Sequence, residues 1–210
     1  MIVLVAKSIL MEQDNKMGSM NIREEVEKKL RALPEKSIER SSSLIVDHVR
    51  NLSLYTQAGI IASYVGVRGE IDPSALTRKP GPKIALPVTT KGEKLRFFIP
   101  DGPLIEGLFG VPQPASGQEV GIKELDLVLV PLVAVDKAGN RLGHGAGYYD
   151  RTFAFRKNTV HPPLVGLAHE FQVVKSIEPK PWDIPVDLLI TESGVNLDKI
   201  TPLAQEIGKD

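Results

Sequence analysis

Residues 125–151 read LDLVLVPLVAVDKAGNRLGHGAGYYDR, and this stretch decides the fold. Its first part, LDLVLVP (125–131), is largely apolar and ends at a proline, which is typical of a buried parallel strand. A second short apolar piece, LVAVD (132–136), is followed by the turn-forming residues 137–140 and by a glycine-rich loop. A helix is predicted from Tyr148. A strand that leads through such a loop into a helix is a common ligand-binding unit of α/β folds.

Apolar runs and helical segments alternate along the rest of the chain. Further strands are predicted in AGIIASYVG (58–66), KIALP (83–87), LRFFI (95–99), PLVGLA (163–168) and VDLLIT (186–191). Helices are predicted at 21–33, 35–52, from Pro73 onward, at 148–156 and at 169–177. This alternation favours βαβ units and a three-layer α/β/α fold with a mainly parallel sheet. Residues 100–118 are rich in Pro and Gly and predict a long loop that forms one wall of the active site, opposite the glycine loop.

The first residues differ in character from the rest of the chain. Residues 1–19 are interpreted as a poorly ordered extension, or as the product of a misassigned start with Met20 as the true initiator. Asn21 with Glu24 resembles a capping box at the start of the first helix. Residues 20–210 are then expected to form a single catalytic domain.

Composition excludes several classes of protein. The chain has no cysteine, which excludes disulfides, thiolate metal sites and a cysteine nucleophile. Its 26 basic and 26 acidic residues balance, which argues against a broad nucleic-acid surface. No segment is long and apolar enough for a signal peptide or a membrane span, so we expect a cytoplasmic protein that acts on small molecules.

The glycine loop has the chemistry of a phosphate site. Its glycines allow positive φ and close approach to a ligand, and their N–H groups can form an anion-binding nest. Arg141 and Arg151 add positive charge, and Asp150 offers an oxygen ligand for phosphate-bound Mg²⁺. The alternative is a glycine-rich hairpin with a surface aspartate. The spacing matches neither a Walker loop nor a dinucleotide fingerprint.

At RLGHGAGYYDR (141–151) the sequence resembles the 5-formyltetrahydrofolate cyclo-ligase family, whose members are also called 5,10-methenyltetrahydrofolate synthetases. The supporting segments stand in the same order, from about residue 22 to 193: REEVEKKLRAL (23–33), VGVRGEID (65–72), ALPV (85–88), FGVPQP (109–114) and WDIPVDLLITE (182–192). The resemblance implies an α/β fold like that of sugar-phosphate isomerases and CoA-transferases, and a monomer or homodimer without nucleic-acid or membrane partners. It also implies ATP- and Mg²⁺-dependent conversion of 5-formyltetrahydrofolate into 5,10-methenyltetrahydrofolate, with release of ADP and phosphate.

The resemblance also assigns roles to residues. Arg141, Tyr148 and Asp150 would be catalytic, and Asp150 with Asp183 would hold Mg²⁺. Val65, Glu70 and Tyr148 would bind the folate. The ATP site would contain Arg23, Arg141, Leu142, Gly143, His144, Gly145, Ala146, Gly147, Tyr148 and Tyr149.

For several of these residues a role that involves no ligand is also open. The alternative for Asp183 is a helix cap or turn residue, that for Glu70 is a solvated turn acid, and that for His144 is a solvent-exposed spacer. Ser19 stands where the family usually has a lysine, so one phosphate contact is missing or comes from Lys16. Rival functions are a related sugar-phosphate isomerase or CoA-transferase and a non-catalytic nucleotide- or folate-binding regulator.

Overall fold

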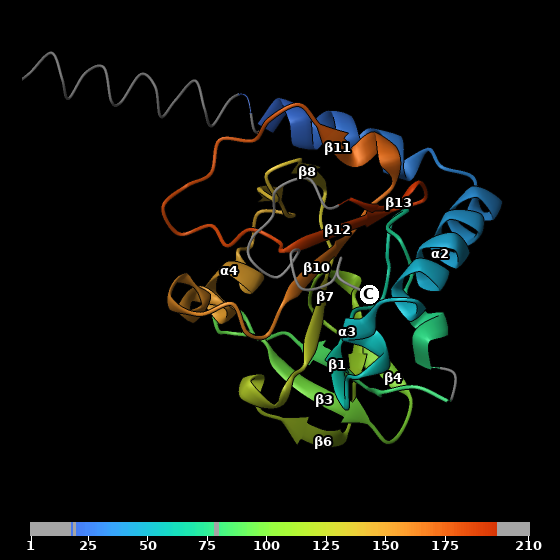
Figure 1. Cartoon of the computed structure of the whole chain (residues 1–210), viewed down its shortest axis with the longest axis vertical. Coiled ribbons are helices and arrows are strands. Elements are labelled where there is room, and N and C mark those ends of the chain that lie inside the picture. The colour runs from blue at the N-terminus through green and yellow to red at the C-terminus, as the bar shows by residue number, and fades with distance from the viewer. Residues whose placement is uncertain (1–17, 19, 78–79, 197–210) are drawn as a thin grey trace, which may run out of the picture.

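The computed structural model describes residues 18, 20–77 and 80–196. Within them, an eight-stranded sheet forms the centre in the order β13-β12-β10-β7-β1-β2-β3-β6 (Figure 1). Its strands are β1 (Ile60–Ala62), β2 (Lys83–Val88), β3 (Arg96–Pro100), β6 (Gly117–Val120), β7 (Leu127–Val130), β10 (Leu164–Leu167), β12 (Leu188–Thr191) and β13 (Gly194–Asn196). The pairs from β12 through β10, β7 and β1 to β2 are parallel, and the outer strands are antiparallel. The predicted mainly parallel sheet is confirmed.

Strand β7 explains why the sequence forms this sheet. Leu127 and Leu129 point into one hydrophobic cluster, and Val128 and Val130 point into another on the opposite face. All four are fully buried, so neither face of the strand meets water. Burial of each such side chain contributes about 1.5–3 kcal/mol. A continuous apolar run is therefore the pattern that a central parallel strand requires.

Layers cover both faces of the sheet. One face is covered by α2 (Glu35–Arg50), α3 (Ser53–Thr56) and the short helix η1 (Ser74–Thr77). On the other face lie α4 (Tyr148–Thr152) and η4 (Ala154–Asn158), with the fully buried Phe153 between them. Figure 1 shows α2 and α4 on opposite sides of the sheet. The predicted α/β fold is confirmed, although its helices are fewer and shorter than expected.

A smaller sheet of β11 (Val173–Val174), β8 (Ala134–Asp136) and β9 (Arg141–Leu142) supports the glycine loop. The helix predicted at 169–177 is wrong, because only η5 (Glu170–Gln172) is helical there. The β-branched Val173 and Val174 pair with β8 instead.

Residues 20–31 form a helix that packs on this small sheet through Val26 and Leu30. The predicted capping box at Asn21 is wrong, because the helix already includes Met20. Residues 1–17 and 19, and the end of the predicted domain from residue 197, lie outside the described residues. The predicted N-terminal extension therefore stays a prediction.

Residues 100–118 are not a plain loop. They contain β4 (Leu104–Glu106) and β5 (Pro112–Pro114), which form an antiparallel hairpin around the short helix η2 (Leu108–Gly110). The chain reverses at Phe109 and Gly110, whose φ angles are 62° and 73°. The remaining short helix, η3 (Ile122–Glu124), leads from β6 into β7. No helix among the described residues is long and apolar enough to cross a bilayer.

Candidate active site

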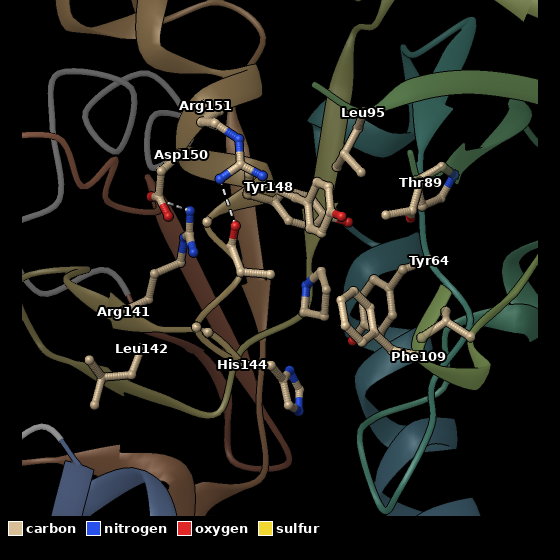
Figure 2. A pocket seen from close by; sticks show the side chains of 18 of the residues that line it. Tyr64, Thr89, Leu95, Phe109, Arg141, Leu142, His144, Tyr148, Asp150 and Arg151 are labelled. Carbon is tan, nitrogen blue, oxygen red and sulfur yellow. Dashed lines mark hydrogen bonds and ion pairs between the residues drawn. The ribbon is translucent and has the colours of Figure 1, made fainter. Parts of the chain in front are cut away.

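One cavity of about 880 Å³ opens where parallel strands β1, β2 and β7 end. Tyr64 follows β1, Thr89 follows β2 and Pro131 follows β7, and all three line it. The glycine loop and the tip of the β4–β5 hairpin complete the wall, as the sequence predicted (Figure 2). Every site residue predicted from the sequence lines this cavity: Arg23, Val65, Glu70, Arg141, Leu142, Gly143, His144, Gly145, Ala146, Gly147, Tyr148, Tyr149, Asp150 and Asp183.

The glycine loop is held by its carbonyl groups, and its N–H groups stay available. Arg23 Nε donates to Gly143 O at 2.9 Å, and Arg151 Nη1 donates to Ala146 O at 2.6 Å. Within the described part of the chain, no backbone N–H of residues 143–147 donates a hydrogen bond. Free N–H groups beside a cavity are the donors that a phosphate accepts. The following helix α4 has only 5 residues, so its dipole adds little.

The loop's three glycines have different backbone conformations. Gly145 and Gly147 have φ angles of 95° and 65°, in the region that favours glycine, whereas Gly143 lies outside it. A Cβ at Gly145 would meet nothing within 4 Å, so the loop is open at this point. The neighbouring Leu142 buries its side chain in the small core under the N-terminal helix, which leaves its backbone to face the cavity.

Arg141 and Asp150 form an ion pair at the base of the loop. The guanidinium Nη2 lies 2.8 Å from Asp150 Oδ1, which also accepts from the Ile184 N–H at 3.1 Å. Arg141 Nε and the Tyr149 hydroxyl are buried without a hydrogen-bond partner. Burial also raises the pKa of Tyr149, so its hydroxyl stays protonated. Unpaired buried donors are costly, and their place at the cavity wall fits a polar ligand.

Glu70 lines the cavity from a closed turn beside His144 of the glycine loop. Its Oε2 accepts from the Val67 N–H at 3.0 Å, and its Oε1 lies 3.8 Å from His144 Nδ1. Burial raises the pKa of Glu70 to about 7, although the Val67 N–H and Arg68 lower it. Burial also lowers the pKa of His144. Glu70 is therefore not a solvated acid, and His144 is half-buried rather than a free spacer.

We expect Glu70→Gln to change how stability depends on pH. Because the pKa of Glu70 is higher in the native state than in the unfolded chain, protonated Glu70 stabilises the native state. This stabilisation is fully present below pH 4.5, the ordinary pKa of a glutamate. That advantage is lost as pH rises through about 7. Relative to that of Glu70→Gln, the free energy of unfolding of the wild type should fall by up to about 3 kcal/mol as pH rises through this range. Urea unfolding of both proteins at pH 5 to 8 measures it, and parallel pH curves would contradict the assignment.

The two aspartates predicted to hold Mg²⁺ both line the cavity. Asp150 uses Oδ1 for its hydrogen bonds, which leaves Oδ2 for an ion. Asp183 Oδ2 accepts from the Lys180 N–H at 2.9 Å, so the turn interpretation of this residue also holds. No group of three or more metal-binding side chains occurs among the described residues. This donor set fits Mg²⁺ that arrives on nucleotide phosphates and keeps most of its ligands from phosphate and water.

The structure adds cavity residues that the sequence analysis missed. Tyr64 is buried, and burial together with the charge of Glu70 raises its pKa well above the usual value. Thr89 directly follows β2 and Tyr64 lies two residues after the end of β1, which is the signal that could have found them. Arg68, Lys180 and Trp182 also line the cavity.

Comparison with known proteins identifies the family. A family model described as the 5-formyltetrahydrofolate cyclo-ligase family matches residues 15–192. The chain belongs to this family. The 5-formyltetrahydrofolate cyclo-ligase of Haemophilus influenzae is 36% identical over 189 residues, which cover 84% of this chain and 99% of the relative. That of Escherichia coli K12 is 31% identical over 147 residues, which cover 66% and 80%.

Solved structures of family members agree with the fold. The NMR structure of Aquifex aeolicus 5,10-methenyltetrahydrofolate synthetase matches with a TM-score of 0.71 at 31% identity, covering 85% of this chain and 91% of that one. The synthetase from Mycoplasma pneumoniae matches with a TM-score of 0.67 at 22% identity, covering 83% and 98%. The second match shows the shared fold.

Proposed function

We propose that this protein is an ATP- and Mg²⁺-dependent cyclo-ligase that converts 5-formyltetrahydrofolate into 5,10-methenyltetrahydrofolate and releases ADP and phosphate. The observation that carries the proposal is the cavity with two chemically different walls. One wall has the free N–H groups of residues 143–147 beside Arg141, and the other has the buried carboxyl group of Glu70. The first wall suits a triphosphate and the second suits the N–H groups of a pterin ring.

The reaction proceeds in two displacements. The formyl oxygen attacks the γ-phosphorus, and ADP leaves. N10 then attacks the formyl carbon, the C–O bond to phosphate breaks, and loss of the N10 proton leaves the cyclic amidinium cation. Neither step needs a side-chain nucleophile, so the protein acts by positioning both substrates and stabilising charge.

The first wall, which we call the phosphate wall, contains residues with separate roles. The loop N–H groups and the Arg141 guanidinium face the charge that develops as the γ-phosphoryl group moves. Asp150, with Asp183, would hold Mg²⁺, which neutralises phosphate charge when bound. Arg23 and Arg151 keep the loop in place through its carbonyl groups.

The residues of the second wall, which we call the folate wall, orient 5-formyltetrahydrofolate. Glu70 Oε1 lies 3.8 Å from His144 Nδ1 of the glycine loop, while the Val67 N–H holds its other oxygen. A carboxylate accepts two adjacent N–H groups well. Val65 and Tyr148 supply apolar and aromatic surface, and Figure 2 shows the Tyr148 ring directed toward Leu95 and Thr89.

The direct test mixes the protein with MgATP and 5-formyltetrahydrofolate and follows the absorbance of the methenyl product. We expect product formation together with ADP release, each dependent on the other substrate. Turnover without ATP would favour an isomerase- or transferase-type reaction. Binding of both substrates without turnover would favour a non-catalytic regulator.

We expect Gly145→Val to lower the affinity for ATP without unfolding the protein. Gly145 has a φ of 95°, which a β-branched residue resists, but its Cβ would meet nothing within 4 Å. The side chain therefore occupies the space through which phosphate approaches the loop. We expect the KM for ATP to rise about tenfold or more, because roughly one charge-assisted hydrogen bond to the phosphate is lost. An unchanged KM for ATP would contradict the anion-binding nest.

A further inference from the structure

His169 lies behind the folate wall and outside the cavity. It follows strand β10 and is 2% exposed. Its Nε2 lies 3.0 Å from the backbone carbonyl of Gly69, and its Nδ1 lies 3.0 Å from Glu192 Oε1. The ring stacks on Phe171 with centroids 5.4 Å apart. His169 therefore joins the C-terminal part of the sheet to the residue that precedes Glu70.

Both ring nitrogens of His169 have oxygen partners. A backbone carbonyl is only an acceptor, so Nε2 must carry a proton. Burial raises the pKa of Glu192, but hydrogen bonds from His169, Ser41 and the Glu170 N–H outweigh it and lower that pKa to about 2. Glu192 Oε1 is the oxygen that faces Nδ1. Each ring nitrogen of His169 therefore faces an oxygen acceptor, one on Gly69 and one on Glu192.

The carbonyl that His169 holds belongs to a strained turn. The Glu70 N–H donates to Val67 O at 3.0 Å, which closes a four-residue turn. Both central residues have positive φ, 54° for Arg68 and 90° for Gly69. Arg68 is not a glycine, so this conformation is costly and needs support from outside the turn. The His169 hydrogen bond supplies such support.

We propose that His169, anchored by Glu192, is a positioning residue for folate binding: it holds the Gly69 carbonyl and so aims the Glu70 carboxyl group into the cavity. His169 does not touch the cavity, so its effect passes through the turn to Glu70. The inference rests on the proposed function, because it assumes that Glu70 binds the folate.

Two substitutions of His169 separate its role from simple packing. His169→Leu removes both hydrogen bonds, whereas the amide of His169→Gln can still donate to Gly69 O. We expect His169→Leu to raise the KM for 5-formyltetrahydrofolate about tenfold, with the KM for ATP and kcat within about twofold of the wild type. His169→Gln should bring the KM for 5-formyltetrahydrofolate most of the way back to the wild-type value. Equal changes in both KM values, or no recovery, would overturn the proposal.

A double-mutant cycle shows whether the effect passes through Glu70. We expect His169→Leu to raise the folate KM in the wild type but not in the Glu70→Gln background. Equal effects in both backgrounds would overturn the proposal. Where His169→Leu fails to fold, the same cycle is run with His169→Asn, which keeps the Glu192 contact but cannot reach Gly69 O. A wild type without turnover on 5-formyltetrahydrofolate refutes the proposed function itself, and equilibrium binding of the folate then tests His169 separately.

Discussion

Asp150→Ala should abolish turnover and also weaken the fold. The carboxylate is the proposed Mg²⁺ ligand, and the structure gives it a second role as the partner of Arg141 and of the Ile184 N–H. The Arg141 side chain is 4% exposed, so alanine leaves a buried charge without its partner. We expect the free energy of unfolding to fall by about 3 kcal/mol. Turnover assays and urea unfolding measure the two effects.

Asp150→Asn is the matched control. Its amide oxygen can still accept from Arg141 Nη2 and the Ile184 N–H, so most of the stability should return. Asparagine lacks the charge that binds Mg²⁺, so turnover should stay absent. Undiminished turnover in the asparagine variant would remove the metal role of Asp150.

Gly69→Ala should strongly destabilise the protein. Gly69 has a φ of 90°, and a Cβ there would lie 2.2 Å from the backbone carbonyl oxygen of Leu30. That carbonyl belongs to the N-terminal helix, which must shift and disturb the packing of Val26 and Leu30. Backbone strain and overpacking together should lower the free energy of unfolding by about 2–5 kcal/mol. The free energy of unfolding in urea measures it.

Gly92→Ala separates the two causes. Gly92 has a similar φ of 80°, but a Cβ there meets nothing within 4 Å. It should therefore cost only the backbone strain, about 1–2 kcal/mol. Equal losses in the two variants would mean that the Leu30 contact contributes nothing.

The predicted strands were confirmed wherever burial alone determines the structure. LDLVLVP, PLVGLA and VDLLIT all form parallel strands, because an apolar run between turn residues has few other ways to bury both faces. The gathering of the candidate site residues could also be predicted. Their positions follow from the glycine loop and from the rule that sites lie at the carboxyl ends of parallel strands.

The predictions that failed depend on partners distant in sequence. The pattern at 169–177 permits a helix, but Val173 and Val174 find a strand partner in β8. Residues 100–118 form a hairpin because β4 and β5 pair with each other, which their Pro and Gly content obscures. Asn21 has a capping pattern, yet the helix extends beyond it. Local propensity is a weak guide where tertiary pairing competes with it.

The sequence by itself determined the α/β fold and the family, because these depend on apolar runs and on a contiguous motif. The phosphate chemistry of residues 141–151 was predicted from the same motif and stays a prediction. Only the tertiary structure decided that Asp150 holds Arg141, that Glu70 is buried with a raised pKa, and that His169 supports the Gly69 carbonyl. Each of these facts joins residues that are distant along the chain or depends on the removal of water. Burial and hydrogen-bond partners exist only after the chain has packed, so no local pattern records them.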